Sequence, residues 1–349
     1  MLKSLSEVGG FFFNSVRYLL LHIKQLKTFA MTNKDRYEQF CKKQTAIPLF
    51  LQKWWMDAVC IGKQWDVFLY EENEQIMAVF VFHYVNKYGL KFILQPQLTQ
   101  YNGIWIDYSP CISAHKKRSL EKRIMYFFIA RLEAEKYVYY EQRFHYSVTN
   151  WLPFYWKGYQ QTTRYTYQLK DLSDVEKCFS KFSSSKQRQI KKTSNNLVVD
   201  FDCSAEEFYR AATDNLSLQQ KKISYSKQLF MSLYWACISR GQGKIIAVRN
   251  KNGQLYAGAF VVWDSMSAYF LLYTIHPEYR SSGASSRMVW EIIQYLSDKV
   301  SIFDFEGSVD EAVELSYSRF GTEQLPCFTI KKSKSFLFSL LIKMKMKKD

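Results

Sequence analysis

The sequence predicts an α/β protein made of two copies of one unit, each a mixed, mostly antiparallel sheet flanked by helices. Strand-like runs occur in the same order in both halves, a proline and then a glycine follow the third run of each half, and the ends of the halves align without a gap. Aromatic residues make up 17% of the chain and are spread through these runs, which favours sheets.

The first half has three strand-like runs, at residues 66–70, 76–84 and 90–94, separated by the turns "EENEQ" and "VNKYG". The break "QPQLTQYNG" follows, and Gly103 then leads into the strand-like "IWI". No arginine and no helix start accompany this glycine. We therefore expect this half not to bind a phosphate-bearing ligand, and to shape an acceptor groove instead.

The second half repeats the order, with runs at 244–249, 254–263 and 267–275 and the hairpin turn "NKNG". Pro277 ends the third run, and a helical pattern begins near Ser285, so strand, loop and helix are predicted in succession. Small residues around Gly283 would leave backbone amides at the helix N-terminus open to a phosphate group. The alternative is a tight connection in which the glycine only supplies a positive φ.

The ends of the halves also match: "GYQQTTRYTYQ" from Gly158 aligns with "GTEQLPCFTIK" from Gly321. We therefore divide the chain into an N-terminal extension (1–30), a first unit (31–170), a second unit (171–332) and a basic tail (333–349).

A formal net charge of +16 favours acidic partners, namely a phosphate-bearing cofactor, RNA or an anionic membrane surface. The apolar stretch 11–23 contains Asn14 and Arg17 and is too short to span a bilayer, so a docked or interfacial helix is expected. The alternative is that the native protein starts at Met31. The tail suits either a membrane-surface contact or a frayed, solvated end. Seven cysteines and five histidines lack metal-ligand spacing. A cytoplasmic protein, peripheral at the inner face of the membrane and without a metal, is the prediction.

The stretch "IHPEYRSSGASSRMV" resembles the acetyl-CoA pyrophosphate loop of the GNAT superfamily of N-acetyltransferases. Pro277, Tyr279, Arg280 and Gly283 match its pattern, and Ser285 departs from it only by a hydroxyl. "YSRFG", residues 317–321, resembles the motif that closes the next helix. The resemblance covers about residues 244–331 and implies acetyl-CoA or another acyl-CoA as co-substrate. It also implies a binding site formed by Thr274, Ile275, Arg280, Ser281, Ser282, Gly283, Ala284 and Ser285.

Two such units in tandem resemble the FemAB-like and cellulose-biosynthesis-type acetyltransferases of bacteria, over about residues 35–332. This implies transfer of an acyl group, acetyl in the first instance, to an amine or hydroxyl of a small or lipid-linked acceptor related to the cell envelope or to a polysaccharide. Members that use aminoacyl-tRNA commonly carry a long helical hairpin, for which residues 180–240 are too short. A FemAB-like, tRNA-dependent transferase acting on a lipid-linked peptidoglycan precursor and a non-catalytic GNAT-fold binding module remain the alternatives, and nucleic acid is expected only under the first of them.

Acyl transfer needs a base for the acceptor and an acid for the departing thiolate. Tyr317 resembles the tyrosine that acts as general acid in many members, although a tyrosine at a helix end is often structural. Glu306 and Asp304 are the candidate bases and would share a face if their strand persists. We prefer Glu306 because it is nearer the loop. Alternatively, these carboxylates cap the next helix or bind the acceptor.

Four residues are candidates for acceptor binding. Arg188 and Lys191 lie on nearly one side of a predicted helix, for which a solvated face is the ordinary reading. Trp151 and Tyr155 could form an aromatic platform, although packing between the two units explains them equally well.

Overall fold

The computed structural model describes residues 31–60, 62, 64–108, 112–307 and 310–335. The predicted interfacial helix, the extension 1–30 and the tail beyond Ser335 lie outside these residues. Within them, no helix is both long enough and apolar enough to cross a membrane.

The first half opens with helices α2 (Asn33–Lys43) and α3 (Lys53–Val59), joined through the 3-10 turn η1 (Leu49–Leu51). Thr32 caps α2, because its hydroxyl accepts the Asp35 amide while the Asp35 carboxylate accepts the Thr32 amide. The remaining elements are β1 (Trp65–Glu72), β2 (Gln75–Lys87), β3 (Leu90–Leu94), β4 (Gly103–Ile106), α4 (Ala114–Ala134), β5 (Tyr139–Arg143), α5 (Leu152–Trp156) and β6 (Gln160–Lys170). The three predicted strands and the strand at Gly103 are confirmed.

The second half begins with α6 (Val175–Ser180), α7 (Ser184–Thr193), β7 (Leu197–Asp200), α8 (Ala205–Ser217) and α9 (Lys227–Ile238). The predicted strands follow as β8 (Gly243–Asn250), β9 (Leu255–Trp263) and β10 (Ser267–Ile275). The chain ends with η3 (Pro277–Ser282), α10 (Ala284–Leu296), β11 (Ile302–Asp304), α11 (Glu311–Ser318) and β12 (Glu323–Ser333). The helix expected near Ser285 is therefore confirmed as α10.

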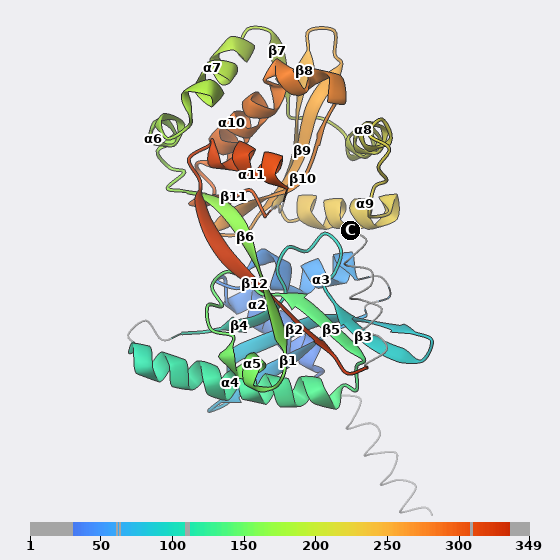
Figure 1. Ribbon diagram of the computed structural model, residues 1–349, viewed down its shortest axis with the longest axis vertical. Coiled ribbons are helices and arrows are strands. Elements are labelled where there is room, and N and C mark those ends of the chain that lie inside the picture. The colour runs from blue at the N-terminus through green and yellow to red at the C-terminus, as the bar shows by residue number, and fades with distance from the viewer. Residues whose placement is uncertain (1–30, 61, 63, 109–111, 308–309, 336–349) are drawn as a thin grey trace, which may run out of the picture.

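The two units are confirmed, each with a mixed, mostly antiparallel sheet, but their sheets are joined into one. The strand order is β1-β2-β3-β5-β12-β6-β11-β10-β9-β8-β7, with β4 paired to β2. Each half gives its last strand to the other: β6 pairs with β11, and β12 pairs with β5. Figure 1 shows β6 and β12 crossing side by side between the lower first half and the upper second half. A boundary after Lys170 therefore leaves neither half with its complete sheet.

The exchanged strands explain why the ends of the halves align in sequence. Both contain 11 residues, and both follow a glycine in the left-handed region, Gly158 at φ 78° and Gly321 at φ 71°. Each glycine lets the chain leave a short helix and turn into the strand.

The hydrophobic core also crosses between the halves. One cluster of buried side chains joins α2 and α3 of the first half to α8, α9, β8 and β9 of the second half. Within it, the ring centroids of Phe50 and Tyr269 are 4.6 Å apart. In the second half, α6, α7, α10 and α11 bury a separate cluster against the sheet. Side chains at the junction are therefore held by both units.

Candidate functional site

The sheet opens between β10 and β11. These parallel strands pair only over Ser267–Tyr269 and Ile302–Asp304. The pairing of β10 with β9 shifts register between Tyr269 and Leu272, which bends β10 away from its neighbour. Among the described residues no strand pairs with the other edge of residues 270–275. The backbone groups of that edge are available to a ligand.

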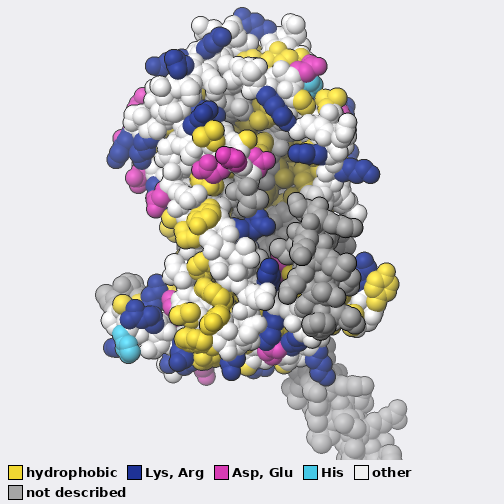
Figure 2. All heavy atoms as spheres, in the orientation of Figure 1, with side chains coloured by type: hydrophobic (Ala, Val, Ile, Leu, Met, Phe, Trp, Pro, Cys, Tyr) yellow, Lys and Arg dark blue, Asp and Glu magenta, His cyan; other side chains and the backbone are white. Residues whose placement is uncertain are grey.

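A cavity of about 810 Å³ lies at this opening, between β10, α10, α11 and the segment after α8. Four basic residues and one acidic residue line it: Lys186, Lys221, Lys222, Arg280 and Asp310. Figure 2 shows acidic side chains gathered over α11 and apolar side chains exposed beside them, toward α8. The cavity combines an apolar lining with a positive charge balance, which suits a ligand with an apolar arm and an anionic group.

The segment that matches the pyrophosphate loop forms one rim of this cavity. Residues 277–282 are a 3-10 turn, and Gly283 at φ 85° starts α10. The Ala284 amide donates to the Ser282 hydroxyl (3.2 Å), so this amide already has a partner. The first helical bond runs from the Arg287 amide to the Gly283 carbonyl, which leaves the Ser285 and Ser286 amides without helical acceptors.

The eight residues proposed to hold acyl-CoA fall into two groups. Thr274, Ile275, Arg280 and Ser285 line the cavity, whereas Ser281, Ser282, Gly283 and Ala284 lie behind its rim. The Thr274 hydroxyl accepts a hydrogen bond from Asn215, and the Arg280 guanidinium donates to Gln219, both on or just after α8.

Gly283 has a packing role that the sequence did not reveal. A Cβ at this position would lie 3.0 Å from Thr193 Cγ2 and 3.5 Å from the Gln189 carbonyl oxygen. Both atoms belong to α7, which packs against α10. Glycine is therefore required here by its positive φ and by the approach of α7, so the alternative reading of this residue has structural support.

Lys186, on the same helix α7 as Arg188 and Lys191, reaches the cavity. Lys186, Ile190 and Thr193 form the buried face of α7, whereas Arg188 and Lys191 are exposed and do not line the cavity. The spacing i, i+4 and i+7 of these three residues is a sequence signal from which this face could have been predicted.

Lys186 is 8% exposed, and its ammonium donates to the hydroxyls of Ser286 and Ser316, each at 3.2 Å. It lies 4.4 Å from the centroid of the Phe320 ring. Burial, together with the positive charge of Arg319, lowers its pKa to about 8. No carboxylate among the described residues forms an ion pair with it, so an anion in the cavity would meet an uncompensated positive charge.

Tyr317 also lines the cavity, from α11. It is buried, and its ring packs 5.0 Å from Phe305 and 6.0 Å from Tyr167. Burial raises its pKa above the ordinary range, and the neighbouring Tyr273 adds to the effect. Tyr317 therefore keeps its proton at neutral pH, as a general acid must before it acts.

The Asp304 carboxylate accepts hydrogen bonds from three groups of the fold itself. These are the Thr166 hydroxyl, the Gln168 amide (2.8 Å) and the Glu306 backbone amide (2.7 Å). Burial raises its pKa to about 6. The alternative that Asp304 or Glu306 caps the next helix is wrong, because Asp310 accepts the first amides of α11.

Glu306 has the features of a reactive carboxyl group. Strand β11 ends at Asp304, and Glu306 has a positive φ of 58°, so the expected alternation along a persisting strand does not apply. Its Oε1 atom is buried without a hydrogen-bond partner in the described structure. Burial raises the pKa of Glu306 well above its ordinary range, the Asp304 charge adds to this, and Arg143 opposes it.

The two aromatic candidates lie elsewhere. Trp151 precedes α5 and Tyr155 lies within it, with ring centroids 5.6 Å apart. Trp151 packs onto the core of the first half, whereas Tyr155 is exposed. Neither residue lines the basic cavity at α10 or the smaller cavity between the halves.

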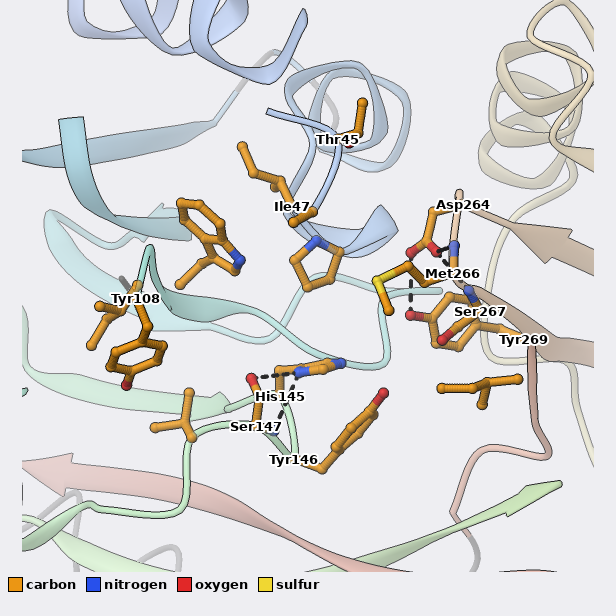
Figure 3. A pocket seen from close by; sticks show the side chains of 16 residues that line it. Thr45, Ile47, Tyr108, His145, Tyr146, Ser147, Asp264, Met266, Ser267 and Tyr269 are labelled. Atoms are coloured by element: carbon orange, nitrogen blue, oxygen red, sulfur yellow. Dashed lines mark hydrogen bonds between the residues drawn. The ribbon is translucent and has the colours of Figure 1, made fainter. Parts of the chain in front are cut away.

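A second, smaller cavity of about 280 Å³ lies between the halves. Figure 3 shows His145, Tyr146 and Ser147 on one side of it and Asp264, Met266, Ser267 and Tyr269 on another. Burial lowers the pKa of His145 to about 3, so this imidazole is neutral, and it is hydrogen-bonded to the Ser147 hydroxyl at 2.8 Å. Burial raises the pKa of Tyr146, and the Asp304 carboxylate adds to the shift. Ile302 of β11 also lines this cavity.

The glycine of the first half has no comparable opening. Gly103 has φ 99°, and a Cβ there would lie 2.6 Å from the Phe144 ring. Side chains of the chain itself fill this place. In the described part of the chain, no three His, Cys, Asp or Glu residues are grouped so that they could hold a metal ion.

Comparisons with known proteins agree with this geometry. Residues 171–312 match the family model described as an acetyltransferase (GNAT) domain. This part of the chain, within the second half, is therefore similar to the acetyltransferase domains of the GNAT family. No curated protein matches the sequence.

Three solved structures share the fold. A structure of FemX has a TM-score of 0.63 at 11% identity and covers 86% of this chain and 96% of its own. A conserved protein of unknown function from Bacteroides thetaiotaomicron has a TM-score of 0.55 at 10% identity, covering 87% and 98%. L-PGS from Bacillus licheniformis has a TM-score of 0.51 at 11% identity, covering 88% and 94%. At these identities the likeness concerns the fold across both halves.

Proposed function

We propose that the protein transfers an acyl group, acetyl in the simplest case, from acyl-CoA to an amine or hydroxyl of a small or lipid-linked acceptor related to the cell envelope or to a polysaccharide. The observation that carries the proposal is the basic cavity at the N-terminus of α10, with Lys186 buried in it. The diphosphate of CoA supplies the negative charge that this lysine lacks. The helix N-terminus attracts the same group through its free amides and dipole.

The transfer uses Glu306, Tyr317, which lines the cavity, and the unpaired edge of β10 at the opening between β10 and β11. The acceptor attacks the thioester carbonyl carbon and gives its proton to Glu306, which burial makes a stronger base than an exposed carboxylate. A C–N or C–O bond forms, the C–S bond breaks, and Tyr317 protonates the thiolate. The unpaired edge of β10 offers backbone amides to the carbonyl oxygen as its negative charge develops.

Asp304 has a positioning role in this proposal. Because it accepts the Glu306 backbone amide, it holds the turn in which Glu306 adopts a positive φ. Thr166 and Gln168 come from β6, so the strand exchanged from the first half fixes the carboxylate that orients the proposed base. Both halves are therefore needed to build one site.

The test is ligand-dependent thermal unfolding of the purified protein, followed by an assay for CoA release. Acetyl-CoA or a longer acyl-CoA should raise Tm, since a ligand bound only by the folded state stabilises it. Pantetheine, which lacks the diphosphate, should raise it less. If only charged tRNA raises Tm, the protein is an aminoacyl transferase like the FemAB-type alternative. Binding of acyl-CoA with no CoA release in the presence of any amine or hydroxyl would favour a binding module.

A further inference from the structure

A strip of polar side chains crosses one face of the sheet where the halves meet. Directly paired residues on neighbouring strands share a face, as do residues two apart on one strand. By this rule Arg143 on β5 lies beside Thr329 on β12, Arg164 on β6 beside Cys327, and Asp304 on β11 beside Gln168. The polar strip consists of Arg143, Thr329, Cys327, Arg164, Thr166, Gln168 and Asp304.

Several atoms in and beside the polar strip are buried without a hydrogen-bond partner in the described structure. They are Arg143 Nε, Thr329 Oγ1, Gln168 Oε1, Tyr101 OH and Glu306 Oε1. Thr329, Gln168 and Tyr101 are at least nine-tenths buried. A buried polar atom without a partner costs free energy, and native proteins rarely leave several together unless water or a ligand satisfies them. This grouping indicates a binding site for a polar ligand.

The charges on the polar strip are separated along it. At one end lie Arg143 and Arg164, on strands that flank β12, and burial together with the charge of Arg164 lowers the pKa of Arg143. No carboxylate of the described residues forms an ion pair with either arginine. Arg143 makes one side-chain hydrogen bond, from its guanidinium to Gln100 at 3.1 Å. At the other end, Asp304 holds the backbone of Glu306. Two adjacent guanidinium groups favour a carboxylate or phosphate, which they can bind through several parallel hydrogen bonds.

We infer that the polar strip binds an acceptor that carries an oxyanion, a carboxylate or a phosphate, at Arg143 and Arg164, and that presents its amine or hydroxyl toward Glu306. This inference rests on the proposed function for the identity of the base and names the class of acceptor. Thr329 and Gln168 supply hydrogen bonds between the two ends. Asp304 accepts its hydrogen bonds from scaffold donors and forms no ion pair with either arginine among the described residues, so both guanidinium groups are left to the acceptor's oxyanion.

The experiment compares the wild-type chain with Arg143→Met, Arg164→Met and the control Arg118→Met, in which an exposed arginine of α4 is removed. Acetate and inorganic phosphate are titrated into each protein by calorimetry. Acceptor competence is then measured with β-alanine, phosphoethanolamine and propylamine, with acetyl-CoA as donor. We expect Arg143→Met to weaken binding of one of the two anions about tenfold or more, since charge-assisted hydrogen bonds are the strong ones. The same variant should raise KM for the matching anionic amine but not for propylamine.

Arg164→Met is an independent second test if Arg143→Met fails to fold, because Arg164 is exposed. Equal anion binding by the wild-type, Arg143→Met and Arg164→Met proteins would overturn the inference, as would no binding to the wild-type protein. Preference for acetate or for phosphate decides which oxyanion the acceptor carries. If acetyl-CoA leaves the wild-type Tm unchanged while anion binding still depends on Arg143, the proposed function fails and the anion site stands.

Discussion

Replacing Lys186 with methionine removes the buried cation of the larger cavity and keeps a side chain of similar length. In the protein without ligand, burying this cation lowers the free energy of unfolding. The difference between its ordinary pKa of 10.5 and the value of about 8 in the fold corresponds to about 3 kcal/mol of stability. Because the pKa is lowered, the unfolded chain binds the proton more tightly between these pH values. Stability of the unliganded protein should therefore rise from about pH 8 to about pH 10.5.

The variant should show opposite effects on stability and on binding. At pH 7 we expect the free energy of unfolding of Lys186→Met to stay level or to rise by up to about 3 kcal/mol, because the desolvation cost is gone. CoA binding should weaken by about 1.5–3 kcal/mol, or about ten- to a hundredfold, the usual worth of a hydrogen bond to a charged group.

The assays are urea unfolding at pH 7 and pH 10 and calorimetric titration with CoA and with pantetheine. Lys191→Met is the matched control, because Lys191 lies on the same helix and is exposed. Pantetheine should bind wild-type and variant alike, since it has no diphosphate. A Lys186→Met protein that binds CoA as tightly as the wild type, or that loses several kcal/mol of stability at pH 7, would show that this lysine is structural.

Three further substitutions test the site. Glu306→Gln should lower kcat by about 10²–10⁴. It should also abolish the acidic limb of the pH profile of kcat/KM, and because burial raises the pKa of Glu306, the wild-type limb should lie above pH 4.5. An acidic limb that persists in the variant would mean that another residue is the base. Tyr317→Phe should lower kcat with little change in KM for the acyl donor, and full turnover would mean that the thiolate leaves unaided. Gly283→Ala should cost about 1–2 kcal/mol of stability, because its φ is 85° and its Cβ would press on Thr193. Gly283→Asp should in addition abolish CoA binding, and equal affinity in both variants would place the diphosphate elsewhere.

The elements of the fold were predictable because their signals are local. Strands at 90–94 and 267–275 are bounded by turn residues, and their predicted limits agree with β3 and β10. The match between the ends of the halves identified β6 and β12 as equivalent strands. It could not reveal that they exchange partners, because pairing with β5 or β11 depends on contacts far apart in the sequence.

The residues of the site could be predicted only where a sequence motif identifies them. The residues taken from the loop resemblance lie at or behind the rim of the basic cavity, because the motif includes the strand, the turn and the helix that build it. On the helix that carries Arg188 and Lys191, the i, i+4 spacing of Lys186 and Ile190 is a signal of a buried face that the sequence analysis missed, because a lysine is ordinarily taken as a surface residue. Arg143 had no local signal at all, since its role depends on strands β12 and β6 beside it.

The most direct test of acyl transfer in this cavity is a crystal structure of the protein with CoA bound. We expect the diphosphate within hydrogen-bond distance of the backbone amides between Ser281 and Ser286 and of the Lys186 ammonium, with the sulfur at the opening between β10 and β11, beside Tyr317. CoA bound in the smaller cavity between the halves, or with its diphosphate away from α10, would contradict it.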